Sequence, residues 1–150
     1  MLREANHLDC LVLAQMGWDY HAEVGNHTSV PYCEKTSLLR TLQAVDDPNQ
    51  LLLVYDKEGI KGFIWAIVGP MLPWSPEPVA MDFILYVVPG ARGSMIGFRL
   101  ISYYQDWAFS KGAREVRISV ASGINEERTS AFYERMGFLP TGKQFNKEAT

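Results

Sequence analysis

The sequence predicts a mixed α/β (α+β) fold, in which helices flank a central sheet with both antiparallel and parallel pairs of strands. Two β-rich runs in the middle of the chain are joined by a short polar turn, which indicates an antiparallel hairpin. A later β-rich run leads into an amphipathic helix and then into a further alternating run, which indicates a helical crossover. No linker interrupts the sequence, so we expect a single domain over residues 1–150.

The first half of the chain is predicted to supply a strand, two helices and the hairpin. Asn6 suits the N-cap of the first helix, and Asp9 adds negative charge to its first turn. A loop over 25–33 separates the two helices, and the polar turn at 56–59 (DKEG) joins the hairpin strands. In order, the predicted elements are a strand over 1–4, helices over 7–24 and 33–45, and strands over 51–55 and 60–68.

The second half is organised around the stretch 80–110, where an apolar strand meets an amphipathic helix through the loop 89–94 (PGARGS). This loop presents backbone N–H groups at the start of the helix, where the helix dipole also attracts an anion. The Pro-rich segment 69–78 before it suits a stiff surface loop. The predicted elements are a strand over 83–88, a helix carrying the apolar stripe Ile96 to Ala108, a strand over 115–120, a helix over 126–136, and extended chain from Phe138.

Composition and charge narrow the class of protein. The formal net charge of −3 and the pI near 5.6 argue against general binding to nucleic acids or anionic membranes, which require basic surfaces. The first residues lack the apolar segment of a signal peptide, and no apolar run approaches the ~18 residues of a membrane span. We therefore expect a cytoplasmic protein with no nucleic-acid and no membrane partner.

The cysteines and histidines predict neither a disulfide nor a metal site. Cys10 and Cys33 are far apart in the sequence and belong to no metal-binding pattern. The three histidines, His7, His21 and His27, include no pair at the i, i+4 spacing of a helical metal site. We expect two reduced thiols, as is usual in the cytosol, and no bound metal.

Two stretches resemble motifs of the GCN5-related N-acetyltransferase (GNAT) family. The run LYVVPGARGSMIGFRL (85–100) resembles the family's acetyl-CoA binding motif, in which a strand leads into R-G-x-G-x-G and a helix. The run SAFYERMGF (130–138) is similar to the family's late helix with its tyrosine and terminal Gly-Phe. The glycine spacing matches neither a dinucleotide fingerprint nor a P-loop. The resemblance implies the GNAT fold, a central mixed, largely antiparallel twisted sheet of about six to seven strands flanked by about four helices.

The resemblance also implies an activity, the transfer of an acetyl group from acetyl-CoA to a primary amine by direct attack on the thioester. The acceptor would be a small molecule, a peptide or a protein, and homodimers are frequent in the family. One alternative is a GNAT-fold protein without catalysis that serves as a binding or assembly module, because Met95 replaces the central glycine of the motif. Another alternative keeps CoA binding but acts on a protein partner as a regulatory modifier.

For the cofactor, the resemblance implies that backbone N–H groups from Gly93 to Phe98 bind the pyrophosphate with the help of Arg92. The edge of the strand would pair with the pantetheine amides, and the N–H of Val87 would stabilise the oxyanion. An asparagine usual in the family is Glu126 in this chain, with Asn125 one place away. The cofactor-binding residues implied are Leu85, Tyr86, Val87, Arg92, Gly93, Ser94, Met95, Ile96, Gly97, Phe98 and Asn125.

For catalysis, the resemblance implies that Tyr133 acts as the general acid that protonates the departing thiolate, with a packed core tyrosine as the alternative. Asp82 is the candidate general base. Alternation along the strand places it on the same face as Ile84, Tyr86 and Val88. The alternative for Asp82 is a residue at the strand end that faces solvent, and the two interpretations have equal weight.

For the acceptor, the end of the first helix and the Pro-rich loop are the segments that usually border the pocket in the family's fold. They contribute His21, Glu23, Trp74 and Glu77, of which His21, Glu23 and Glu77 also compete with Asp82 for the role of base. Acidic side chains there would attract a cationic amine such as a polyamine, a lysine, a peptide N-terminus or a basic antibiotic.

Overall fold

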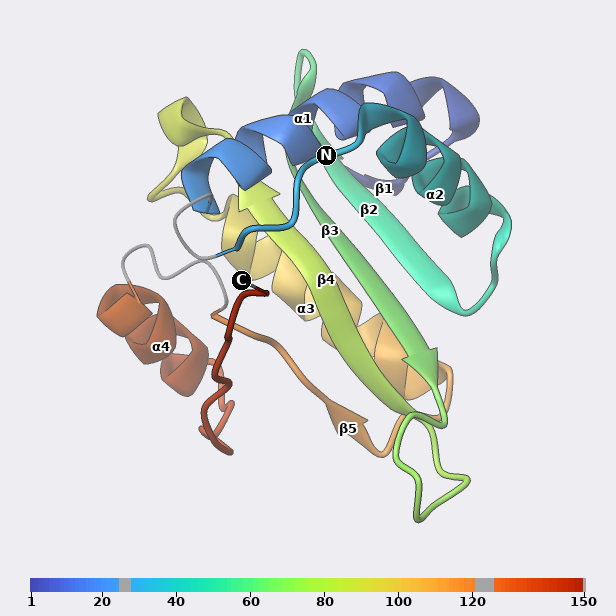
Figure 1. Cartoon of the computed structure of the whole chain (residues 1–150), viewed down its shortest axis with the longest axis vertical. Helices are drawn as coiled ribbons and strands as arrows, with labels where there is room; N and C mark the ends of the chain where they lie inside the picture. The colour runs from blue at the N-terminus through green and yellow to red at the C-terminus, as the bar shows by residue number, and fades with distance from the viewer. Residues whose placement is uncertain (25–27, 121–125, 150) are drawn as a thin grey trace.

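The computed structural model describes residues 1–24, 28–120 and 126–149, within which the chain forms five strands and four α-helices (Figure 1). None of these helices is long and apolar enough to span a bilayer. Two single-turn helices, η1 (His7–Asp9) and η3 (Pro89–Ala91), precede α1 and α3. The other elements are β1 (Leu2–Glu4), α1 (Cys10–Val24), α2 (Glu34–Asp46), β2 (Gln50–Asp56), β3 (Ile60–Gly69), β4 (Val79–Val87), α3 (Ile96–Ser110), β5 (Glu115–Val116) and α4 (Glu126–Arg135).

The sheet has the strand order β1-β2-β3-β4-β5. Each neighbouring pair from β1 to β4 is antiparallel, whereas β4 and β5 are parallel and are connected through α3. The mixed pairing predicted from the sequence is therefore confirmed. The turn between β2 and β3 uses left-handed backbone at Glu58 and Gly59, which is the geometry expected of a tight hairpin.

Helices cover both faces of the sheet, α1 and α2 on one and α3 on the other (Figure 1). Successive residues of β2 alternate between the two layers, so that Leu51 and Leu53 pack under α3 while Leu52 and Val54 pack under α1. Burial of each such side chain contributes about 1.5–3 kcal/mol. The residues that α3 adds to its layer are Ile96, Leu100, Tyr104 and Ala108.

The start of the helical layer follows the prediction closely. The Asn6 side chain accepts the N–H of Leu8 at 2.9 Å, and Asp9 Oδ2 accepts the N–H of Asn6 at 2.8 Å, which together form a capping box. The first turn is η1, and α1 begins only at Cys10. Arg3 on β1 binds Asp9 at 2.7 Å and therefore fixes this cap to the edge of the sheet.

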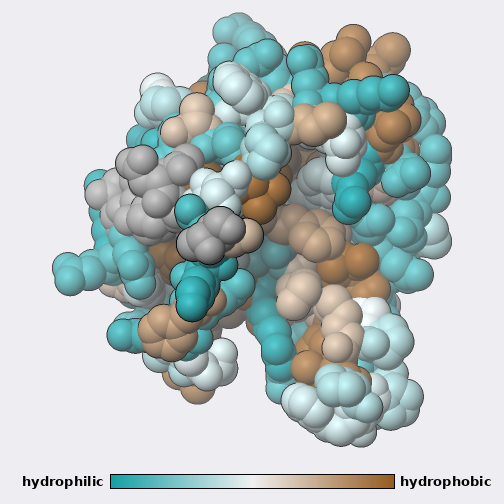
Figure 2. Space-filling view, in the orientation of Figure 1, coloured by the Kyte–Doolittle hydropathy of each residue, from teal (hydrophilic) through white to brown (hydrophobic). Residues whose placement is uncertain are grey.

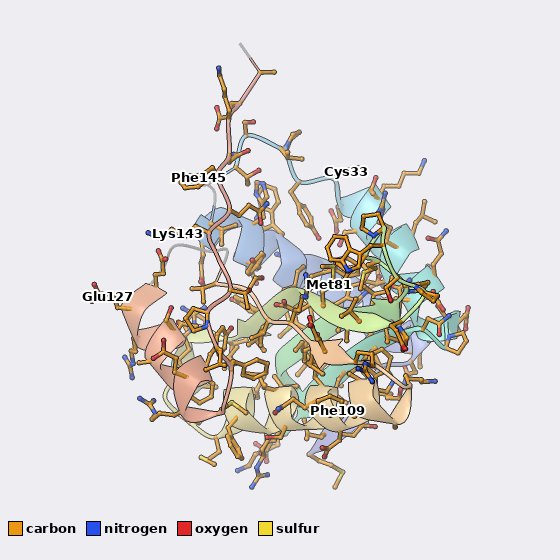
Figure 3. All side chains as sticks on the ribbon, turned by 90° about the horizontal axis from the view of Figure 1, so that it is seen from below. Cys33, Met81, Phe109, Glu127, Lys143 and Phe145 are labelled. Atoms are coloured by element: carbon orange, nitrogen blue, oxygen red, sulfur yellow. The ribbon has the colours of Figure 1, made fainter. Side chains whose placement is uncertain are left out.

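The C-terminal third contains less strand than predicted. Only Glu115 and Val116 of the predicted strand 115–120 pair with β4, and Arg117 adds one hydrogen bond to Ala80. Phe138–Lys147 form no strand, so the described residues give a five-stranded sheet rather than one of six to seven. Leu139 and Phe145 are 82% and 89% exposed, so the segment has no apolar anchor on the described part of the molecule that would hold it beside the sheet. Figure 3 shows Phe145 on this C-terminal segment, which leaves the body of the molecule.

Candidate functional site

The connection from β4 to α3 builds a set of unpaired donors. Gly93 has φ of +82°, a conformation that glycine adopts without strain. Ser94 Oγ donates to the Ala91 carbonyl at 2.6 Å and accepts the N–H of Ile96 at 3.3 Å, which closes the turn. Within the described residues, the backbone N–H groups of Met95, Gly97 and Phe98 meet no protein acceptor. These donors lie at the positive end of a 15-residue helix and are suited to bind an anion.

Met95, the departure from the family motif, does not fill this turn. Its side chain is 59% exposed, and it takes the N-cap position of α3 without a side-chain hydrogen bond. A Cβ atom built on Gly97 would have no neighbour within 4 Å, so the space above the first turn is open. Ile96 points the other way and is buried under the sheet.

Arg92 is held by three groups on the protein. Its Nε donates to the Val87 carbonyl at 2.9 Å, and its Nη2 lies 2.7 and 2.8 Å from the two carboxylate oxygens of Glu23. The guanidinium also stands 5.6 Å from the centre of the Tyr86 ring. Arg92, which was predicted to bind the cofactor, and Glu23, which was predicted to bind the acceptor, thus form an ion pair. This pair joins the β4–α3 loop to the end of α1.

Among the described residues, no strand pairs with the outer edge of β4 beyond its short pairing with β5. The N–H of Val88 donates to Lys61 on β3, so the peptide groups of Leu85 and Val87, which alternate with it, face away from β3. In Figure 1 the chain after β5 spreads away from β4. Figure 2 shows the same side of the molecule, and apolar side chains are exposed in the middle of that view. An extended ligand with amide groups matches such an edge.

A β-bulge in β4 changes the position of Asp82. Trp65 on β3 pairs with Ile84, but the next residue, Ala66, pairs with Asp82, so Phe83 is the extra residue. The side chain of Asp82 therefore shares the α3 face with Ala66. The predicted face, that of Ile84, Tyr86 and Val88, is wrong, because strict alternation does not continue through a bulge.

Asp82 and Tyr133 converge on Ser119, in the segment where β4 and the chain after β5 separate. Asp82 Oδ1 accepts the N–H of Ser119 at 3.1 Å and lies 3.4 Å from its hydroxyl. Burial raises the pKa of Asp82 to about 6, and the hydrogen bonds from Ser119 only partly oppose it. The carboxylate is thus ionised at neutral pH and basic enough to take a proton.

Tyr133 on α4 is buried, and its hydroxyl donates to the Ser119 carbonyl at 3.3 Å. Burial first, and then the negative charge of Asp82, raise the pKa of this phenol. It therefore remains protonated at neutral pH and has a proton to give. Sequence reasoning did not identify Ser119, which bridges Asp82 to Tyr133 through its backbone and carries no motif of its own.

The four predicted acceptor residues do not form one pocket. Glu23 lies beside Arg92 at the C-terminal end of β4, and His21 Nε2 is 2.8 Å from the Val30 carbonyl, with its ring stacked on Trp18. Trp74 and Glu77 precede β4 instead and line a shallow pocket of about 370 Å³. The nine residues of β4 separate the two ends by about 26 Å. Asn125 lies outside the described residues.

The model of the family described as "Acetyltransferase (GNAT) family" matches residues 13–138. Among curated proteins, none matches the chain.

Several solved structures share the fold at low sequence identity. A transcriptional regulator from Bacillus halodurans C-125 is 21% identical, with 99% of each chain covered and a TM-score of 0.78. A putative acetyltransferase from Agrobacterium tumefaciens str. C58 is 18% identical, with 99% of each chain covered and a TM-score of 0.77. An aminoglycoside acetyltransferase from an uncultured soil metagenomic sample, in complex with trehalose, is 18% identical over 100% of this chain and 95% of that one, with a TM-score of 0.71.

Proposed function

Because the chain belongs to the acetyltransferase (GNAT) family, we propose that it transfers an acetyl group from acetyl-CoA to a primary amine of a small molecule, peptide or protein. The observation that carries the proposal is the convergence of an ionised carboxylate, Asp82, and a protonated phenol, Tyr133, on Ser119. Acetyl transfer from a thioester to an ammonium group needs one group that takes a proton and one that gives it.

The residues present suit the coenzyme. The N–H groups of Met95, Gly97 and Phe98, which meet no acceptor among the described residues, would bind the diphosphate, and the outer edge of β4 would pair with the amides of the pantetheine arm. Asp82 and Val87 are five residues apart, about 16 Å along the strand, so that a long arm bound at the loop brings its far end to Asp82. Acetyl-CoA, when bound, supplies the activated acetyl group as a thioester.

Separate groups of the chain would accept the proton, stabilise the oxyanion and donate the proton. The Asp82 carboxylate accepts a proton from the attacking ammonium group, which leaves a neutral amine as the nucleophile. The N–H of Leu85 faces the outer edge of β4 three residues from Asp82 and would stabilise negative charge on the acetyl oxygen. Val87 is the less suitable donor, because it adjoins the diphosphate loop and its carbonyl holds Arg92. The Tyr133 hydroxyl would give a proton to the departing sulfur, and the second proton that the nitrogen loses as the amide forms would restore the Tyr133 phenol.

The acceptor is proposed to be a cationic amine. The end of α1 carries the Asp19 carboxylate and the aromatic side chains of Trp18 and Tyr20, and the Tyr20 ring contacts Tyr86 on β4. Glu23, on the same helix end, is already paired with Arg92. Negative charge there attracts ammonium groups. The aminoglycoside acetyltransferase among the structures of this fold is consistent with a polycationic acceptor.

The test measures acetyl-CoA binding by calorimetry and then thiol release with a panel of polyamines, aminoglycosides, lysine peptides and peptide N-termini. The proposal expects binding and thiol release with at least one amine. Absence of binding would favour the alternative of a GNAT-fold assembly module. Binding without release on small amines, together with labelled proteins in a lysate supplied with labelled acetyl-CoA, would identify a protein acceptor.

A further inference from the structure

A basic pocket of about 470 Å³ lies beside the β4–α3 loop, on the side of the β2–β3 hairpin. Lys57 comes from the hairpin turn, Lys61 from the start of β3 and Arg99 from the first turns of α3. The remaining wall belongs to the β4–α3 loop and its neighbours. The other lining residues are Tyr55, Val88, Gly90, Ala91, Ser94, Met95 and Ile96.

Backbone hydrogen bonds hold the three segments that carry these cations. The Lys61 carbonyl accepts the N–H of Val88 at 2.9 Å, so the start of β3 is tied to the strand that leads into the loop. The N–H of Lys57 donates to the Gly59 carbonyl at 3.0 Å, and the N–H of Arg99 donates to the Met95 carbonyl at 3.0 Å. All three residues line the pocket, so cations from three separate elements share one concave surface.

The described residues that line this pocket carry positive charge only: none of them is an aspartate or a glutamate. Within the described residues, none of the three cations forms an ion pair, in contrast to Arg3, Arg92 and Arg117. Close cations without a counter-charge repel one another, and a dianionic group relieves that repulsion. The pocket therefore favours an anion of more than one negative charge.

The position of the pocket, next to the β4–α3 turn, indicates which anion it binds. Ser94, Met95 and Ile96 belong both to its wall and to the turn proposed to hold the diphosphate of the coenzyme. A second phosphate, joined to that diphosphate through a single ribose, reaches an adjoining pocket. CoA carries such a group on the 3′ oxygen of its ribose, and a phosphomonoester bears about −1.5 to −2 charge at neutral pH.

We propose that Lys57, Lys61 and Arg99 form a binding site for the 3′-phosphate of CoA and make the protein selective for CoA over 3′-dephospho-CoA. This inference rests on the proposed function, since it requires the diphosphate on the β4–α3 loop. Arg99 binds the phosphomonoester with its planar fork, and the two lysines supply point charges from the opposite wall.

The experiment compares CoA with 3′-dephospho-CoA by calorimetry in the wild-type chain, in the single variants Lys57→Gln, Lys61→Gln and Arg99→Gln, and in the triple variant. The wild type should bind CoA at least about tenfold more tightly, since each charge-assisted contact is worth about that factor. Each substitution should reduce the ratio of the two affinities, and the triple variant should abolish it. The affinity for 3′-dephospho-CoA should stay unchanged, which also shows that each variant retains the diphosphate site.

Lys111→Gln is the matched control, because Lys111 is an exposed cation at the opposite end of α3. It should leave the ratio as in the wild type. Equal affinities of the wild type for the two coenzymes, or an unchanged ratio in the triple variant, would overturn the 3′-phosphate site and leave the proposed function standing. Failure of both coenzymes to bind the wild type would instead overturn the proposed function, and this inference with it.

Discussion

Asp82 and Tyr133 contact the same residue from two sides: the carboxylate accepts the N–H of Ser119 at 3.1 Å, and the phenol donates to the Ser119 carbonyl at 3.3 Å. One peptide segment therefore sets the relative position of a base from β4 and an acid from α4. Neither side chain is hydrogen-bonded to the other, although the negative charge of Asp82 helps to raise the pKa of Tyr133.

Asp82→Asn removes the proposed base. We expect kcat/KM to fall by about 10²–10⁴-fold, which is the usual contribution of a positioned acid or base. Because burial raises the pKa of Asp82 to about 6, the wild-type rate should decline as the pH falls through about 6. A pH–rate profile checks both expectations, and the same acidic decline in the variant would exclude Asp82 as the titrating base.

The same substitution has a consequence for stability. A carboxyl whose pKa is raised by folding prefers its protonated form in the folded state, so the folded protein loses stability as the pH rises from about 4 to about 6. Asp82→Asn removes this loss, worth about 1–3 kcal/mol. The melting temperature of the variant minus that of the wild type should therefore be a few degrees larger at about pH 7.5 than at about pH 4. An equal difference at both pH values would contradict the raised pKa.

Tyr133→Phe tests the proposed acid while keeping the ring in the core. The rate of acetyl transfer should fall by about 10²-fold or more, with CoA affinity nearly unchanged. Rate assays and calorimetry separate the two effects. Tyr104→Phe is the control, since Tyr104 is also buried and its hydroxyl donates to the Arg117 carbonyl at 2.7 Å, yet it has no proposed catalytic role. A wild-type rate in Tyr133→Phe would leave Tyr133 as a packing residue only.

The strand-loop-helix around 80–110 could be predicted because its signals are local. Alternating apolar residues, the glycines and prolines of the loop and the helical stripe all act over a few positions. The face of Asp82 could not be predicted, since the bulge at Phe83 is created by pairing with β3 and has no glycine to mark it. The alternation of 115–120 suits a strand, but beyond Arg117 the N–H of Ser119 binds the Asp82 side chain instead of a strand backbone.

Contacts between residues that are distant in the sequence could not be predicted either. Glu23 and Arg92 are 69 positions apart, and only the fold brings them together as an ion pair. Lys57, Lys61 and Arg99 likewise meet only because the hairpin turn packs beside the start of α3.

The Glu23–Arg92 pair predicts opposite effects of two neutral substitutions. Arg92→Gln should weaken CoA binding by about tenfold, because it removes a cation next to the diphosphate site. Glu23→Gln should strengthen CoA binding, since Arg92 then no longer has to leave a bidentate carboxylate before it binds phosphate. Calorimetry with both variants checks this, and weaker binding in Glu23→Gln would show that the pair positions Arg92 for the cofactor instead of competing with it.

The central claim is that the main-chain donors between Gly93 and Phe98 bind the diphosphate of CoA and so direct the thioester to Asp82 and Tyr133. A crystal structure of the protein grown with excess CoA tests it most directly. The predicted result is a diphosphate within hydrogen-bond distance of the N–H groups of Met95, Gly97 and Phe98, with the pantetheine along β4 and the sulfur beside Tyr133. A coenzyme bound elsewhere, or a loop that stays empty at saturating CoA, would contradict it.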